Sequence, residues 1–102
     1  MKVDYSKAFS KAVKKLSGKV LQSVIKMIDE VKSAPSIDAI TDCKKLEAFN
    51  SVYRIRVGNR RAFFTLHVVV TGELVVFQYI FSRGEAYDKK NMEKLRNCDG
   101  IC

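Results

Sequence analysis

The hydrophobic pattern of this 102-residue chain changes its period near Phe49. Before this point apolar residues recur every three or four positions, the spacing of an amphipathic helix. After it they alternate with polar residues, the spacing of a half-buried strand. Helices followed by strands predict an α+β domain. Because a chain of this length buries one modest core, we expect a single domain over residues 1–102.

Two helices are predicted in the first third of the chain, at about residues 6–16 and 19–32. Ser17-Gly18 separates them, and Ala34-Pro35 ends the second. So short a link predicts an antiparallel helix hairpin whose apolar stripes pack against a sheet. Residues 37–45 are interpreted as a connector with one helical turn.

Three strands are predicted at about residues 51–57, 61–70 and 74–82, and a short helix at about 88–96. Gly58-Asn59 and Thr71-Gly72 are typical two-residue hairpin turns. The expected fold is therefore a helix hairpin packed on a mostly antiparallel sheet of three to four strands, followed by a C-terminal helix. Residues 97–102 are expected to form a loose tail.

Three cysteines, Cys43, Cys98 and Cys102, fit neither an even disulfide framework nor a CxxC metal motif. We therefore expect free thiols, no metal site and no cofactor. No apolar run approaches the length of a membrane span, and the first residues lack a secretory signal. These features predict a cytoplasmic protein without a membrane partner.

The formal net charge of +8 predicts a polyanionic partner, with nucleic acid as the first candidate. Four of the six arginines fall between Arg54 and Arg61, and no acidic residue lies between Glu47 and Glu73. Excess charge can also serve solubility alone. Clustering on predicted strands favours binding, because the planar guanidinium group suits phosphate.

The two turns predict which side chains share a face, because directly opposed residues of an antiparallel pair do so. The first turn pairs Arg56 with Arg61 and Arg54 with Phe63, and the second pairs Arg61 with Ser82. One face, covered by the helix hairpin, is predicted to carry Ile55, Val57, Ala62, Phe64, Leu66, Val68, Val75, Phe77, Tyr79 and Phe81. The other is predicted to carry Arg54, Arg56, Arg61, Phe63, Thr65, His67, Gln78 and Ser82, with Arg83 at its edge.

Like charges crowded on one rim repel one another, so a bound anion is favoured there. The alternative is that the arginines pair with acids elsewhere, at Glu47, Glu85 or Asp88.

Four short motifs occur in an order that resembles the RelE/ParE superfamily of bacterial toxins from toxin–antitoxin modules. They are Lys45-Leu46, Tyr53-Arg-Ile-Arg56, Arg61-Ala-Phe-Phe64 and Ser82-Arg-Gly-Glu-Ala-Tyr87. The likeness covers nearly the whole chain and implies the fold expected above. One departure is the short segment at residues 3–5, which leaves little room for the family's usual first strand.

Members of the RelE branch cut mRNA in the ribosomal A site without a metal. The 2′-hydroxyl of the RNA attacks the adjacent phosphate, which gives a cyclic phosphate and a free 5′-hydroxyl. The resemblance implies that Arg61 and Arg83 clamp the scissile phosphate, and that Tyr87 stacks on a base or assists proton transfer. The residues expected to contact RNA are Arg54, Arg56, Arg60, Phe63, Lys89 and Lys90.

Arg54 and Arg56 occupy positions where RelE has lysines. Because arginine does not lose its proton as a crowded lysine can, we expect these residues to hold charge rather than to act as a base. The candidates for a base are then Tyr87, Glu85 and His67.

Two other functions stay open. A ParE-like toxin shares the fold and inhibits DNA gyrase by binding, without cutting RNA. The third hypothesis is a non-toxic RNA- or DNA-binding domain, in which Phe63 stacks on a base. For a toxin, the resemblance implies a small antitoxin with an acidic or amphipathic segment that wraps it, over apolar residues such as Phe63, Val76 and Ile80.

Overall fold

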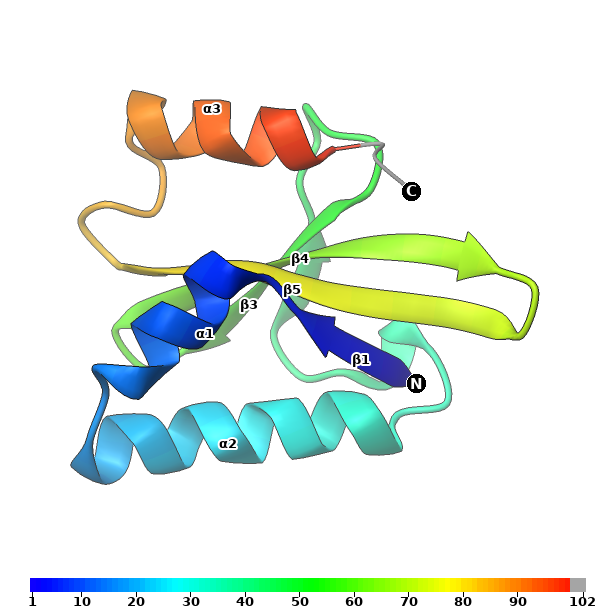
Figure 1. The fold of residues 1–102 in the computed structure, drawn as a ribbon, viewed down its shortest axis with the longest axis horizontal. Coiled ribbons are helices and arrows are strands. Elements are labelled where there is room, and N and C mark those ends of the chain that lie inside the picture. Colours follow the sequence, from blue (N-terminus) through cyan, green and yellow to red (C-terminus); the bar gives the residue numbers. More distant parts are fainter. Residues whose placement is uncertain (100–102) are drawn as a thin grey trace.

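The structure, a computed structural model, describes residues 1–99 and has the predicted α+β architecture (Figure 1). A mixed sheet lies between α2 on one side and α3 on the other. The elements are β1 (Lys2–Tyr5), α1 (Lys7–Lys14), α2 (Gly18–Ser33), the 3-10 turn η1 (Ile37–Ala39), β2 (Cys43–Lys45), β3 (Val52–Val57), β4 (Arg60–Val69), β5 (Gly72–Ser82) and α3 (Lys89–Cys98).

The sheet has five strands in the order β1-β5-β4-β3-β2, so the prediction of three to four strands was wrong. The two additional strands are short and lie at the edges. β1 runs parallel to β5, with Tyr5 opposite Phe77, and it occupies the segment where little room for a strand was expected. β2 runs antiparallel to β3, with Lys44 opposite Arg54, and it ends the predicted connector.

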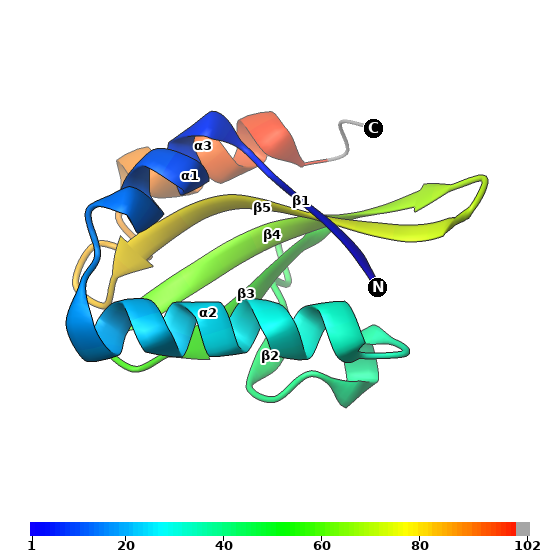
Figure 2. The ribbon, with the colours of Figure 1, turned by 60° about the horizontal axis from the view of Figure 1, so that its bottom comes forward.

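The helix hairpin packs on one face of the sheet, as predicted. Figure 2 shows α1 and α2 running in roughly opposite directions. The hydroxyl of Ser6 accepts a hydrogen bond of 3.0 Å from the main-chain nitrogen of Phe9 and so caps α1. The Phe9 ring stacks on that of Phe77 at 5.0 Å between centroids. The core on this face includes Phe9, Val24, Met27, Val31, Ile55, Val57, Ala62, Phe64, Val75, Phe77 and Ile80.

The C-terminal helix α3 packs on the opposite face and forms a second core. Leu95 and Met92 supply its apolar side, and Asp88 caps its first turn through a 2.8 Å bond from the main-chain nitrogen of Lys90. The sheet and its flanking segments contribute Leu46, Phe49, Val52, Phe63, Tyr79, Phe81 and Ala86. This helix, and not a partner, therefore covers Phe63.

The first hairpin has the predicted register, with Arg56 opposite Arg61 and Arg54 opposite Phe63. The second does not. Its closing pair is Val69 and Gly72, so the turn is Val70-Thr71 and the predicted turn at Thr71-Gly72 was wrong. Gly72 has a φ of +128°, a conformation that side-chain-bearing residues rarely adopt.

A β-bulge changes the faces further along β5. Phe64 lies opposite Phe77, whereas Phe63 lies opposite Tyr79, so Gln78 is an extra residue without a partner in the ladder. Tyr79 and Phe81 therefore lie on the α3 face, while Ile80 and Ser82 lie on the α2 face. The prediction had these four residues reversed, because an extra residue inverts the alternation that follows it.

The β4–β5 hairpin projects beyond the rest of the sheet (Figures 1 and 2). Val68 lies near its tip and is 82% exposed, so its predicted position under the helix hairpin was wrong. Val70, in the turn, is fully exposed. The helices end before they reach this tip.

The prediction of a loose tail was wrong for residues 97–99. α3 continues through Cys98, and the Asp99 carboxylate accepts hydrogen bonds of 2.8 Å from Asn50 N and 2.7 Å from Ser51 N. Residues 100–102, including Cys102, lie outside the described residues. Within residues 1–99, no helix is both long and apolar enough to cross a membrane.

Candidate functional site

Arginines from two strands and one loop gather at the end of the sheet where the β3–β4 turn lies. Arg56 and Arg61 are directly opposed across β3 and β4, on the α3 side of the sheet. Arg54 lies two pairs further along, on the same face, and Arg83 follows β5. We call these four residues the basic rim.

Arg61 is the most buried residue of the basic rim. It is only 9% exposed, and its Nη1 atom donates to the main-chain oxygens of Gly58 at 3.3 Å and Arg60 at 3.1 Å. Gly58 turns the chain here with a φ of +58°, in the left-handed region that favours glycine. The β3–β4 turn therefore fixes one end of the Arg61 guanidinium group.

Arg54 carries a buried donor without a partner. Its Nε atom is the one buried side-chain nitrogen or oxygen within residues 1–99 that makes no hydrogen bond. Lys44, directly opposite on β2, adds a second cation to this row. Sequence reasoning missed the contribution of Lys44, because a three-residue edge strand carries no readable alternation.

The β5–α3 loop, residues 83–88, brings Arg83 and Tyr87 to the same end of the molecule. The main-chain nitrogen of Arg83 donates to the Asn59 oxygen at 2.7 Å, which ties the loop to the β3–β4 turn. The Tyr87 ring meets that of Phe63 at 6.2 Å between centroids. The β5–α3 loop and the β3–β4 turn thus lie at the same end of the sheet (Figure 1).

Two acids near the basic rim already have other hydrogen bonds. Glu85 Oε1 accepts a 2.8 Å bond from the hydroxyl of Ser82, and Asp88 caps α3. These contacts weaken the alternative in which such acids neutralise the arginines.

Two predicted contact residues do not face the basic rim in the expected way. Phe63 is fully buried beneath α3, so a nucleobase cannot stack on it in this arrangement, and that prediction was wrong. Arg60 lies opposite Val57 and Ser82, on the α2 side, where it lines a pocket of about 340 Å³ together with Lys19. It is therefore separated from its neighbour Arg61.

Lys89 and Lys90 lie in the first turn of α3, directly after the loop, and both are exposed. They remain free to contact a polyanion that follows the loop. Their role is still a prediction.

His67 belongs to a separate polar cluster under α3. It is 7% exposed, and its Nε2 atom lies 2.8 Å from the hydroxyl of Thr65, which accepts a 3.0 Å bond from Gln78. The rise of a strand places it about 20 Å along β4 from Arg61. His67 is thus too far from the basic rim to act there.

Two thiols are held in their protonated form. Burial raises the pKa of Cys43 to about 11, against the opposing charge of Arg54. Burial also raises the pKa of Cys98, whose Sγ lies 3.7 Å from Gln78 Oε1. Neither thiol is suited to act as a nucleophile near neutral pH. Among residues 1–99, no group of three or more His, Cys, Asp or Glu residues is placed to hold a metal ion.

The chain is similar to archaeal and bacterial toxins. It is 33% identical over 89 residues to Toxin RelE3 of Methanocaldococcus jannaschii, a match that covers 86% of this chain and 97% of that protein. The crystal structure of a RelB-RelE antitoxin-toxin complex from Methanococcus jannaschii matches with a TM-score of 0.65 and 28% identity, over 84% of this chain and 96% of the other.

A mutant of E. coli toxin RelE in the free state matches with a TM-score of 0.68 and 20% identity, over 95% of each chain, and supports the fold alone. No model of a known protein family matches the sequence.

Proposed function

This chain belongs to the RelE toxin family, and we propose that it inhibits translation by cutting mRNA on the ribosome. The observation that supports the proposal is the basic rim. The β3–β4 turn that binds the Arg61 side chain also accepts the main-chain nitrogen of Arg83, and Tyr87 follows in the same loop. The resemblance of the sequence to the RelE branch assigns the phosphate clamp to the same two arginines.

Phosphate cleavage by the RNA's own 2′-hydroxyl requires little of the protein besides charge and position. The attack builds a dianionic pentacoordinate phosphorane, which fixed guanidinium groups stabilise. Arg61 suits this task, because its Nη1 atom is already held by the β3–β4 turn and loses little freedom on binding. Arg83, on the opposing loop, completes the clamp.

Arg54 and Arg56 extend the charge along β3, where they hold the RNA backbone. The unpartnered Nε of Arg54 supplies a donor for one phosphate oxygen after a small side-chain movement.

In this proposal Tyr87 carries out the proton transfer. Glu85 accepts a hydrogen bond from Ser82, and His67 lies about 20 Å away by the strand rise. Tyr87 is 53% exposed, and its ring contacts Phe63, the next residue after Arg61 on the same face of β4. It is therefore placed to donate a proton to the leaving 5′-oxygen or to stack on the neighbouring nucleobase.

We also propose that a RelB-like antitoxin neutralises this chain. Two of the similar structures, from Methanococcus jannaschii and Pyrococcus horikoshii, are complexes of RelE with RelB. The net charge of +8 suits an antitoxin segment that carries acidic side chains.

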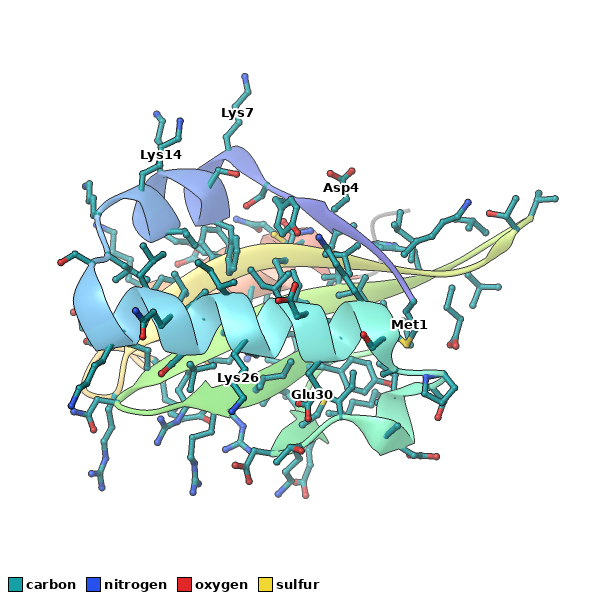
Figure 3. The ribbon with its side chains drawn as sticks, turned by 90° about the horizontal axis from the view of Figure 1, so that it is seen from below. Met1, Asp4, Lys7, Lys14, Lys26 and Glu30 are labelled. Carbon is teal, nitrogen blue, oxygen red and sulfur yellow. The ribbon has the colours of Figure 1, made fainter. Side chains whose placement is uncertain are left out.

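The test compares wild type with Arg61→Ala/Arg83→Ala on ribosomes programmed with a defined mRNA. We expect wild type to cut in the A site and the double variant to lose at least about 100-fold in rate. A matched control is Lys7→Ala/Lys14→Ala, which removes two charges from α1 on side chains that project away from the sheet (Figure 3).

The control should cut like wild type. Intact mRNA with wild type, combined with inhibition of gyrase supercoiling in a parallel assay, would replace our proposal with the ParE-like alternative.

A further inference from the structure

The loop that carries Arg83 and Tyr87 is held by one buried side chain of α3. Asn91 is 8% exposed, and its Nδ2 atom donates a 2.7 Å hydrogen bond to the main-chain oxygen of Glu85. Glu85 lies between Arg83 and Tyr87 in the chain. The amide of Asn91 therefore contacts the middle of the segment whose two ends are proposed to contact RNA.

The bond from Arg83 N to the Asn59 oxygen attaches only the start of the loop, and its remaining main-chain bonds lie within the loop itself. At its start, the Ser82 oxygen accepts from the main-chain nitrogens of Glu85 and Ala86, at 3.1 and 2.9 Å. At its end, Asp88 N donates to the Glu85 oxygen at 3.1 Å. These bonds shape the loop internally. Ala86, which is fully buried in the second core, and Asn91 are what attach its middle to the helix and the sheet.

We propose that Asn91 is a positioning residue, which fixes the geometry of Arg83 and Tyr87 by holding the Glu85 carbonyl group. The inference rests on the proposed function for its catalytic consequence. A buried amide that donates at 2.7 Å places the loop more narrowly than apolar packing alone, because the bond has both a preferred length and a preferred direction. Catalytic groups displaced by about 1 Å lose about 100-fold in rate.

The main variant is Asn91→Asp, which keeps the shape of the side chain but replaces its donor with an acceptor that faces the Glu85 oxygen. Asn91→Ala removes the donor without adding charge, and it serves if the first variant does not fold. Asn97→Asp is the matched control, since it makes the same change at an exposed position of the same helix.

Two readouts separate positioning from general stability. On programmed ribosomes, kcat of Asn91→Asp should fall at least about tenfold, while KM changes less than about twofold. In hydrogen exchange, the amides of Glu85, Ala86 and Asp88 should exchange about tenfold faster, which corresponds to the loss of one hydrogen bond. Exchange in β3 and β4, and both readouts in Asn97→Asp, should stay as in wild type.

Unchanged loop exchange, or faster exchange spread evenly over the sheet, would overturn the positioning role. So would a rise in KM at constant kcat. If wild type itself leaves mRNA intact, the proposed function fails. The exchange experiment still decides whether Asn91 holds the loop.

Discussion

The ring of Tyr87 meets the ring of Phe63 edge-on, at 6.2 Å between centroids and with 88° between the ring planes. Phe63 is fully buried, whereas Tyr87 is 53% exposed. The tyrosine ring thus contacts a fully buried residue on one side, and about half of its surface stays open to a ligand. Edge-to-face pairs of this kind contribute about 0.5–1.5 kcal/mol beyond the area that they bury.

Tyr87→Phe tests the hydroxyl, because it preserves the ring contact. If that hydroxyl moves a proton, the cleavage rate should fall by about 100-fold while the melting temperature stays unchanged. Tyr5→Phe, at another partly exposed tyrosine, is the control and should cleave normally. A Tyr87→Phe variant as fast as wild type, with a slow Tyr87→Ala, would assign the residue to base stacking instead.

Loss of the Arg61 side chain should destabilise the fold more than loss of the Arg83 side chain. Arg61→Ala removes a buried stem and two bonds to main-chain oxygens, so the free energy of unfolding should fall by about 1–3 kcal/mol. Arg83 is exposed, and Arg83→Ala should change the free energy of unfolding by no more than about 0.5 kcal/mol. Urea unfolding of both variants measures the difference. Equal losses would mean that the turn does not hold Arg61.

Asp99 should stabilise the fold only above acidic pH. Burial alone would raise the pKa of its carboxyl group, but hydrogen bonds from Asn50 and Ser51 and the charge of Lys45 outweigh burial and lower the pKa. A carboxyl group with a lowered pKa stabilises the folded state above its unfolded pKa of about 4, and this contribution is lost as the pH falls through the folded pKa.

Asp99→Asn should therefore cost about 1–2 kcal/mol at pH 7, a value reduced for partial exposure. The difference from wild type should close as the pH falls below about 4. Thermal unfolding across pH measures it. A difference that stays constant down to about pH 2 would contradict the assignment.

Gly58 should resist substitution because of its backbone and not because of crowding. Its φ of +58° is strained for other residues, although a methyl group added to its Cα would meet no neighbouring atom within 4 Å. Gly58→Ala should lower the free energy of unfolding by about 1 kcal/mol. Gly84→Ala is the matched control, since Gly84 also has open space and lacks the positive φ. Equal stabilities for the two variants would refute the backbone explanation.

Periodicity predicted the three helices and the three long strands, because each buries a stripe or face long enough to read. It did not predict β1 or β2. These strands have four and three residues, and their pairing depends on the edges that β5 and β3 offer. The sequence of an edge strand does not contain the geometry of its neighbour.

The candidate site was predictable on the β3–β4 side, where Gly58-Asn59 sets the register of Arg54, Arg56 and Arg61. The rest of the site depends on tertiary packing and was not predictable from the sequence. Burial of Phe63 follows from the position of α3, and the hold on the β5–α3 loop follows from one side chain, Asn91. Neither contact follows from the hydrophobic periodicity or turn motifs of the sequence.

The extra residue at Gln78 has a consequence for any insertion or deletion in β5 of this chain. Deleting Gln78 would restore simple alternation and give every later residue of β5 the opposite parity. Tyr79 and Phe81 would then turn toward α2, and Ile80 toward α3. The loop would leave the strand from the wrong side, with Arg83 and Tyr87 directed away from Arg61. The single unpaired residue Gln78 therefore determines from which face of the sheet the β5–α3 loop leaves. It thus decides whether Arg83 lies on the same side of the sheet as Arg61.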